Sequence, residues 1–270
     1  MTIWLGLLAL SLALYSAGMI CSVVAVLRPK GRAPRLAWTL FPHACVIHLL
    51  SFFAQWHQQA IFPLHTLLGA FSLYALLTLV GGVWFAWRSD SLAAAFSLGV
   101  IPWACLVLVF TLRFQATQLV TQLPPGFLSV HLFVTMVSFA AFSLAAGAGV
   151  LLLSQESALK QKRFGPYWEA LPPLGDLDRE TYRSIVVGFL FLGFAIVQGI
   201  VGAPRAWGRF WYNDGRLLSS IAVWLGYGLY LCARARYGWR GRRLALFAVI
   251  GFVLTLVTYV LINMGKVLFG

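Results

Sequence analysis

Long apolar runs that recur along the whole sequence constrain the fold of this chain most. A helix needs about 20 apolar residues to cross the hydrocarbon layer of a bilayer, and we count about eight such runs. They cover residues 3–27, 36–54, 64–87, 92–112, 127–153, 184–203, 217–233 and 244–262. Since 61% of all residues are hydrophobic and 10% charged, we predict an all-α, polytopic membrane bundle that forms a single domain over residues 1–270. The first run is expected to be a retained helix, because it lacks a preceding positive run and a small-residue cleavage site.

The basic residues predict how these helices are oriented. Alternate connectors carry 15 and 5 of the 20 Lys and Arg residues. Because Lys and Arg are enriched in cytoplasmic loops, the richer connectors are expected inside and both termini outside the cytoplasm. A net charge of +13 suggests nucleic acid in a soluble protein, but here the charges lie at helix ends beside anionic lipid. We therefore expect membrane lipid as a partner and no nucleic acid.

Four of the five histidines, His48, His57, His65 and His131, lie on the predicted outer side. His48 lies within the second run, roughly 9 Å below its outer end, and His131 lies about one turn into the fifth. Ionisable residues inside a membrane are costly, which makes both histidines functional candidates. The alternative is that each forms a hydrogen bond to a neighbouring helix. The clustering of four histidines on one side favours a binding site.

An aromatic connector lies on the same predicted side. Residues 202–216 read GAPRAWGRFWYNDGR, with Trp207, Phe210, Trp211 and Tyr212 beside Arg205, Arg209 and Arg216. The interfacial belt of Trp and Tyr explains scattered aromatics in any membrane protein. It explains four aromatics within six residues less well. This connector is therefore the expected wall of the site.

Haem suits this set of residues better than zinc or a proton relay. Zinc favours closely packed ligands that include carboxylates or thiolates, and the outer side offers Asp214 alone. A proton relay usually contains a buried Asp or Glu, and none of the runs has one. Neutral imidazoles serve as axial ligands of haem iron, and arginines pair with its propionates. We expect non-covalent, b-type haem with His48 and His131 as candidate ligands and with His57 and His65 nearby.

The connector at residues 154–183 contains five of the seven acidic residues. We interpret it as a solvated, mixed-charge loop, with Asp176 or Asp178 as the N-cap of the next helix. The small-residue run AAFSLAAGAG in the fifth apolar run predicts close helix packing. A small-solute transporter is disfavoured, because the apolar runs lack buried charges.

The sequence resembles the cytochrome c assembly proteins of the CcsA, HemX and YpjD kind. Its strongest similar pieces are LPPLGDLDRETYRSIVVGFLFLGFAIVQG, WGRFWYND, AVWLGYGLYL and GWRGRRLALFAVIGF. The resemblance implies a bundle of membrane helices with an extracytoplasmic, tryptophan-rich segment that handles haem. His48 corresponds to the family's membrane histidine and His131 to its first extracytoplasmic histidine. Trp207, Gly208, Trp211 and Asp214 match the tryptophan-rich motif.

Four departures indicate a reduced member of the family. Asn213 replaces the third tryptophan of the motif, and GRLL follows Asp214 where Pro-Lys-Glu-Thr is expected. Cys232 stands at the second membrane histidine, and the tail NMGKVLFG has no terminal histidine. These departures place the chain closest to the HemX and YpjD branch.

The resemblance implies a haem-handling factor for cytochrome c biogenesis in the bacterial plasma membrane, an assembly factor more than an enzyme. A second assembly subunit or apocytochrome c is the expected protein partner. The alternative is a membrane regulator or scaffold of haem biosynthesis, which acts through the connectors at 154–183 and 234–243 without transferring haem.

Overall fold

A computed structural model describes residues 2–59, 62–112, 124–163, 165–207 and 215–269; side chains are described except at 203–207, 216 and 258–269. All regular secondary structure in these ranges is helical. Among the described residues, seven helices are long and apolar enough to cross a membrane: Ile3–Leu27, Ala33–Gln59, Leu67–Arg88, Leu92–Thr111, Pro125–Lys160, Leu174–Gly202 and Leu217–Tyr237. They confirm the predicted all-α, multi-pass fold. The eighth predicted run lies within α9 (Arg242–Phe269), whose side chains are described up to Val257.

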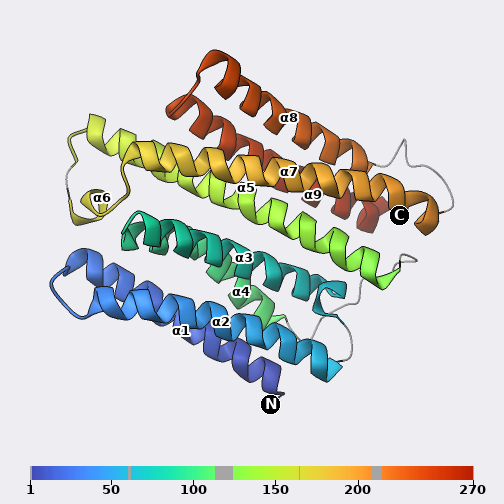
Figure 1. Ribbon diagram of the computed structural model, residues 1–270, viewed down its shortest axis with the longest axis horizontal. Helices are drawn as coiled ribbons and strands as arrows, with labels where there is room; N and C mark the ends of the chain where they lie inside the picture. Colours follow the sequence, from blue (N-terminus) through green and yellow to red (C-terminus); the bar gives the residue numbers. More distant parts are fainter. Residues whose placement is uncertain (1, 60–61, 113–123, 164, 208–214, 270) are drawn as a thin grey trace. The chain divides into compact units, whose positions relative to one another are not determined.

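The helices group into two compact units (Figure 1). The first comprises Met1–Leu119 with Ser154–Asp176, and the second comprises Val120–Leu153 with Leu177–Gly270. Assignment of the whole chain to one domain stays a prediction.

The first unit contains α1 (Ile3–Leu27), α2 (Ala33–Gln59), α3 (Leu67–Arg88) and α4 (Leu92–Thr111). Helix α1 packs along α2 and also against α4, and α3 packs along α4. A Cβ added to Gly18 would lie 3.1 Å from the Phe41 ring, so a glycine lets α1 approach α2 closely. The Trp103 indole N–H donates to Ser16 Oγ at 3.0 Å and links α4 to α1.

The start of α3 depends on a short turn. The 3₁₀ helix η1 (Pro63–His65) precedes it, and Thr66 Oγ1 caps α3 by accepting from the Gly69 N–H at 3.0 Å. A Cβ on Gly69 would lie 1.9 Å from the Pro63 carbonyl oxygen, so only glycine fits there. Because of this cap, α3 begins three residues after the predicted start at residue 64.

The connector at residues 154–183 is mostly helical, so its interpretation as a loop is wrong. Helix α5 continues to Lys160, α6 spans Pro166–Glu169, and α7 begins at Leu174. Ser91 Oγ donates to the Ala170 carbonyl at 2.6 Å, and the hydroxyls of Ser97 and Tyr167 lie 2.7 Å apart. The segment around α6 is therefore bound to α4. The predicted N-cap is also wrong, because Asp176 and Asp178 both follow the first residue of α7.

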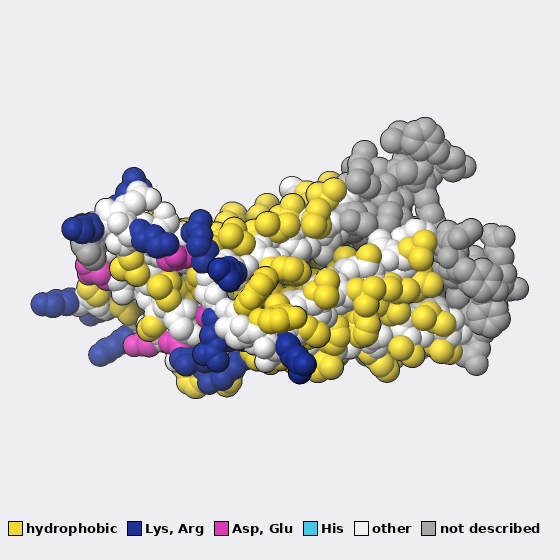
Figure 2. Space-filling model, turned by 90° about the horizontal axis from the view of Figure 1, so that it is seen from above, with side chains coloured by type: hydrophobic (Ala, Val, Ile, Leu, Met, Phe, Trp, Pro, Cys, Tyr) yellow, Lys and Arg dark blue, Asp and Glu magenta, His cyan; other side chains and the backbone are white. Residues whose placement is uncertain are grey.

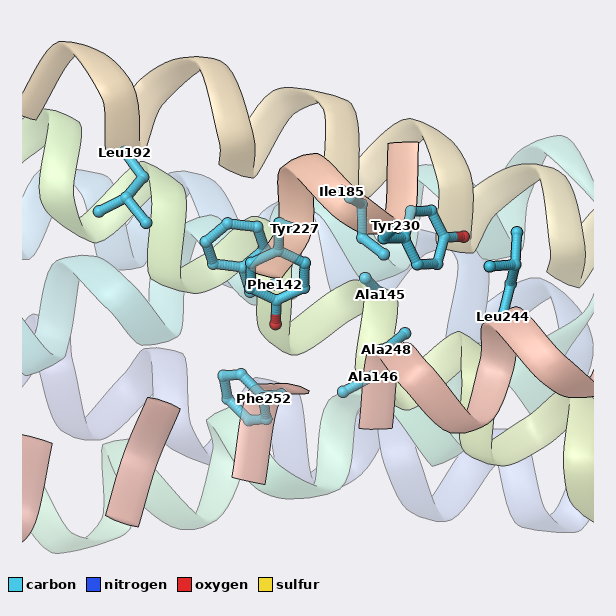
Figure 3. Packing of buried hydrophobic residues seen from close by; sticks show 10 residues of the cluster. All are labelled: Phe142, Ala145, Ala146, Ile185, Leu192, Tyr227, Tyr230, Leu244, Ala248 and Phe252. Atoms are coloured by element: carbon cyan, nitrogen blue, oxygen red, sulfur yellow. The ribbon is translucent and has the colours of Figure 1, made fainter. Parts of the chain in front are cut away.

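The second unit consists of α5 (Pro125–Lys160), α7 (Leu174–Trp207), α8 (Gly215–Tyr237) and α9, apart from the ends of α5 and α7 assigned to the first unit. Figure 3 shows its core, in which the Phe142 and Tyr227 rings stack with centroids 3.9 Å apart. A Cβ on Gly188 would lie 2.5 Å from Phe142, and one on Gly149 would lie 3.1 Å from the Ala245 carbonyl oxygen. The contact at Gly149 confirms that the small-residue run of α5 permits close packing.

The outer faces of the helices carry many exposed apolar side chains. Leu190, Phe194 and Val197 on α7 and Leu225 and Leu229 on α8 are each more than half exposed. Figure 2 shows hydrophobic side chains (yellow) over much of one face, with most of the Lys and Arg side chains (dark blue) toward its left-hand end. Such faces are stable in contact with lipid tails, which agrees with a multi-pass membrane protein.

Candidate functional site

His48 is a fully buried polar side chain of the first unit, with 0% of its surface exposed. It lies on α2, where its imidazole Nε2 is 3.0 Å from the Ser72 hydroxyl oxygen of α3. The Tyr15 ring of α1 meets the imidazole edge-on, with centroids 6.1 Å apart. Three helices thus hold this histidine in place.

The second ring nitrogen of His48, Nδ1, is buried without a hydrogen-bond partner among the described residues. A serine hydroxyl both donates and accepts, so the contact with Ser72 permits either imidazole tautomer. Buried donors left without a partner are rarer than buried acceptors. This favours the tautomer in which Nε2–H donates to Ser72 and Nδ1 keeps a free electron pair. A neutral imidazole nitrogen of this kind is able to bind a metal.

A small cavity of about 30 Å³ reaches Ser72 from the ends of α1, α2, α3 and α4. Its lining includes the polar side chains of Ser51, Gln55, Gln59 and Ser72. A cavity of this size accommodates roughly one or two water molecules, whereas ligand pockets usually measure roughly 300 Å³ or more. Water therefore fits beside the partner of His48, but a porphyrin does not.

His65 and His57 lie near the end of α2 that is predicted to face outward. Phe62 contacts three rings there, those of Phe52, Trp56 and His65, with centroids 5.1 to 6.2 Å apart. His65 is half-buried at the end of η1, and His57 is exposed in the last turn of α2. The structure thus places His65 in an aromatic cluster and leaves His57 at the surface.

His131 belongs to the second unit, on α5. Its Nδ1 is buried without a hydrogen-bond partner in the described part of the chain. A Cβ added to Gly199 of α7 would lie 3.8 Å from His131 Cε1, so the ring rests against α7 at a glycine. His131 resembles His48 in having a buried ring nitrogen that is not used.

The remaining predicted site residues lie in the aromatic connector. Trp211, Asp214 and Arg209 lie outside the described residues, as do the side chains of Arg205 and Trp207. Cys232, at the position of the family's second membrane histidine, is exposed on α8.

The imidazole nitrogens are suitable ligands for haem iron, but the observed space around His48 is too small for haem. Within the described ranges, no three His, Cys, Asp or Glu side chains converge to hold a metal ion. The buried imidazoles of His48 and His131 are of the type that coordinates haem iron. Since His48 is completely enclosed, haem reaches it only if the surrounding helices separate.

Sequence reasoning missed Ser72 and Tyr15, the two partners of His48. Ser72 is a lone polar residue in the apolar stretch GAFSLYAL, which is a weak signal. The rotation of α3 relative to α2 decides whether this serine faces His48, and hydropathy does not specify that rotation.

Taken together, these observations define a multi-pass membrane protein that buries single histidines between its helices. The sequence matches the family model described as Cytochrome C assembly protein over residues 40–268. It is 33% identical over 236 residues to a cytochrome c biogenesis protein CcsA of Synechococcus sp. (strain CC9902), covering 78% of this chain and 77% of that protein. A CcsA of Synechococcus sp. (strain CC9311) is 32% identical over 241 residues, covering 78% and 79%.

A solved structure, the cytochrome c haem lyase CcmF, has a similar fold. The TM-score is 0.63 at 19% identity, and the match covers 93% of this chain and 45% of CcmF. The chain thus spans less than half the length of that lyase, and the likeness concerns the fold alone. The family match and the CcsA relatives show that the chain belongs to the cytochrome c assembly protein family, as its sequence resemblance predicted.

Proposed function

We propose that this protein handles haem during cytochrome c biogenesis in a bacterial plasma membrane. The observation that carries the proposal is the fully buried imidazole of His48, whose Nδ1 has no partner in the described structure. An imidazole left unsatisfied inside a membrane protein is costly and is retained where it serves a function. Family membership and the names of the relatives point to cytochrome c biogenesis.

In this proposal His48 and His131 are the candidate axial ligands of non-covalent, b-type haem. Haem is treated as cargo, and its iron takes the electron pair of a neutral imidazole. Trp207, Trp211 and Asp214 form the wall of the site, Arg205 and Arg209 pair with the propionates, and His57 and His65 are alternative ligands. Ser72 keeps His48 in one orientation until the helices around it part.

The partners proposed are membrane lipid and a second assembly subunit or apocytochrome c. We also propose that the chain belongs to the HemX and YpjD branch, because Asn213 and Cys232 replace two residues of the complete family pattern. The relatives named above are CcsA proteins. A strain that lacks its own CcsA tests the branch: this chain should not restore covalent cytochrome c there if the branch is right.

The alternative is a regulator or scaffold that does not transfer haem. The enclosure of His48 and its bond to Ser72 favour this second candidate, because they leave no room for a porphyrin in the observed arrangement. In this case the connectors at 154–183 and 234–243 would contact the partner.

Complementation of the protein's own deletion strain separates the two functions. Wild type, H48A, H131A and the double variant are expressed at matched membrane levels, and covalent cytochrome c is measured by haem staining. H43A is the control, because His43 is an exposed histidine of the same helix. Haem handling predicts that the double variant behaves like the deletion while H43A behaves like wild type. Full complementation by the double variant would support the scaffold instead.

A further inference from the structure

The turn between α8 and α9 concentrates positive charge. Five arginines lie within ten residues in this turn and the adjoining ends of α8 and α9: Arg234, Arg236, Arg240, Arg242 and Arg243. Residues 215–270, which include α8, the turn and α9, contain no Asp or Glu. Asp178 on α7, which lies in the same unit, contacts this turn through its carboxylate.

Both carboxylate oxygens of Asp178 make contacts that hold the turn in place. Its Oδ2 accepts from Arg234 Nη2 at 2.8 Å, and its Oδ1 accepts from the Gly241 backbone N–H at 2.8 Å. Both side chains of the ion pair are only 14% exposed. The Arg234 guanidinium also lies 4.4 Å from the centre of the Tyr182 ring. Arg234 is thus paired with a carboxylate and mostly buried as part of the frame.

Backbone conformation and backbone hydrogen bonds also hold the turn in place. Gly238 and Gly241 have φ values of 63° and 62°, in the left-handed region that favours glycine. The Trp239 N–H bonds to the Ala233 carbonyl at 3.4 Å, and the Ala245 N–H bonds to the Gly241 carbonyl at 2.9 Å. These contacts give the residues between the two glycines a fixed position relative to both helices.

Cationic and aromatic side chains project from this frame. Arg236, Arg240 and Arg243 are exposed, and Trp239 and Tyr237 are 40% and 74% exposed. The Arg243 guanidinium lies 5.7 Å from the centre of the Trp239 ring, within the range of a cation–π contact. Arg240 is also attracted by Asp178, but both oxygens of that carboxylate already accept hydrogen bonds.

We propose that this turn is a binding site for the headgroup of an anionic phospholipid. Arginine donates pairs of parallel hydrogen bonds to phosphate oxygens, and Trp and Tyr favour the headgroup layer of a bilayer. Because the turn joins two apolar helices, it lies at the depth of the lipid headgroups. Arginines on a fixed turn lose less freedom on binding than arginines on an unstructured loop. This site is independent of haem.

Lipid binding to the purified protein tests the proposal. Native mass spectrometry in mild detergent counts bound phosphatidylglycerol, with phosphatidylcholine as the neutral probe. The variant R240Q/R243Q removes two exposed charges. The matched control R32Q/R35Q removes two exposed charges from the turn between α1 and α2 and the first turn of α2. Each arginine near an anionic surface contributes about 1 kcal/mol, so loss of two should weaken phosphatidylglycerol binding about thirtyfold in R240Q/R243Q, with little change in the control.

Two further variants and two further probes distinguish a specific headgroup site from diffuse electrostatic attraction and from a site for free phosphate. R240K/R243K keeps the charge but loses the paired hydrogen bonds, and it should bind with intermediate affinity. D178N should weaken lipid binding without removing an arginine, because the frame of the turn is lost. Equal losses in R240Q/R243Q and R32Q/R35Q would overturn the proposal in favour of diffuse attraction. Equal binding of phosphatidylcholine, or displacement of the lipid by millimolar inorganic phosphate, would also overturn it.

Discussion

Ser72 is the residue on which the geometry of His48 depends. If Ser72 is replaced by alanine, the buried imidazole loses the contact at Nε2 and is left with two unsatisfied nitrogens. Leaving a buried polar group unpaired costs about 1–3 kcal/mol. We therefore expect S72A to lower the thermal midpoint of the purified protein by several degrees.

The control for S72A is S51A. Ser51 is buried beside the same cavity, but its hydroxyl donates to the His48 backbone carbonyl within its own helix. Loss of that bond leaves the carbonyl able to keep its helical partner, so S51A should have a smaller effect. Equal destabilisation by both variants would contradict a specific role of Ser72.

The individual site residues were predictable to different degrees. His48 and His131 were identified from their rarity in apolar runs, and the structure places each against a neighbouring helix with one buried nitrogen unused. Ser72 and Tyr15 were not identified, because side-chain partners depend on helix rotation. The relation of His48 and His131 to each other, and to Trp207 and Trp211, stays a prediction.

The start of α3 leads to a prediction about the stability of this helix and of the first unit. In G69A the new Cβ would overlap the Pro63 carbonyl oxygen, so η1 and the Thr66 cap must shift. We expect G69A to destabilise the first unit strongly, by about 3 kcal/mol or more, and to lower the amount of protein in the membrane. G99A on α4 is the control, because its Cβ would lie 3.9 Å from the nearest atom. Normal expression and stability of G69A would refute the close approach described here.

The ion pair between α7 and α8 gives a second prediction, about how these two helices are held together. Replacing Asp178 with alanine leaves Arg234 mostly buried without its carboxylate and frees the Gly241 N–H. Breaking a buried pair in this way costs about 3–5 kcal/mol, and we expect somewhat less because both side chains are partly exposed. The i,i+4 pair of Glu156 and Lys160 is more exposed, so K160A should cost about 0.5 kcal/mol or less. Thermal unfolding followed by circular dichroism compares the two.

Hydropathy predicted the apolar helices well and their continuations poorly. The limits of α1 and α4 agree with the predicted runs to within one residue, because apolar length decides where a membrane helix runs. The connector at 154–183 was misinterpreted because its polar residues continue α5 and begin α7 as helix. A charged sequence identifies the end of the apolar segment, but it does not identify the end of the helix.

The orientation of the whole molecule follows from the arginine count and stays a prediction. Both termini are expected outside the cytoplasm, with the turns at 28–35 and 234–243 inside. Single cysteines introduced at Arg32, Arg236 and Gln58, in a variant whose four native cysteines are replaced, test this orientation. An impermeant maleimide added to intact cells should label position 58 but not 32 or 236. The reverse labelling pattern would show that the orientation is inverted.

Haem binding is the central claim for this molecule, and the absorption spectrum of the purified protein tests it most directly. Membranes from cells supplied with a haem precursor are solubilised, and the protein is purified. Its absorption spectrum is recorded across the Soret and visible regions. We predict a Soret band in wild type and in H43A that is reduced or shifted in H48A and in H131A. Absence of a Soret band from the wild-type protein, even after haem is added to it, would contradict the account.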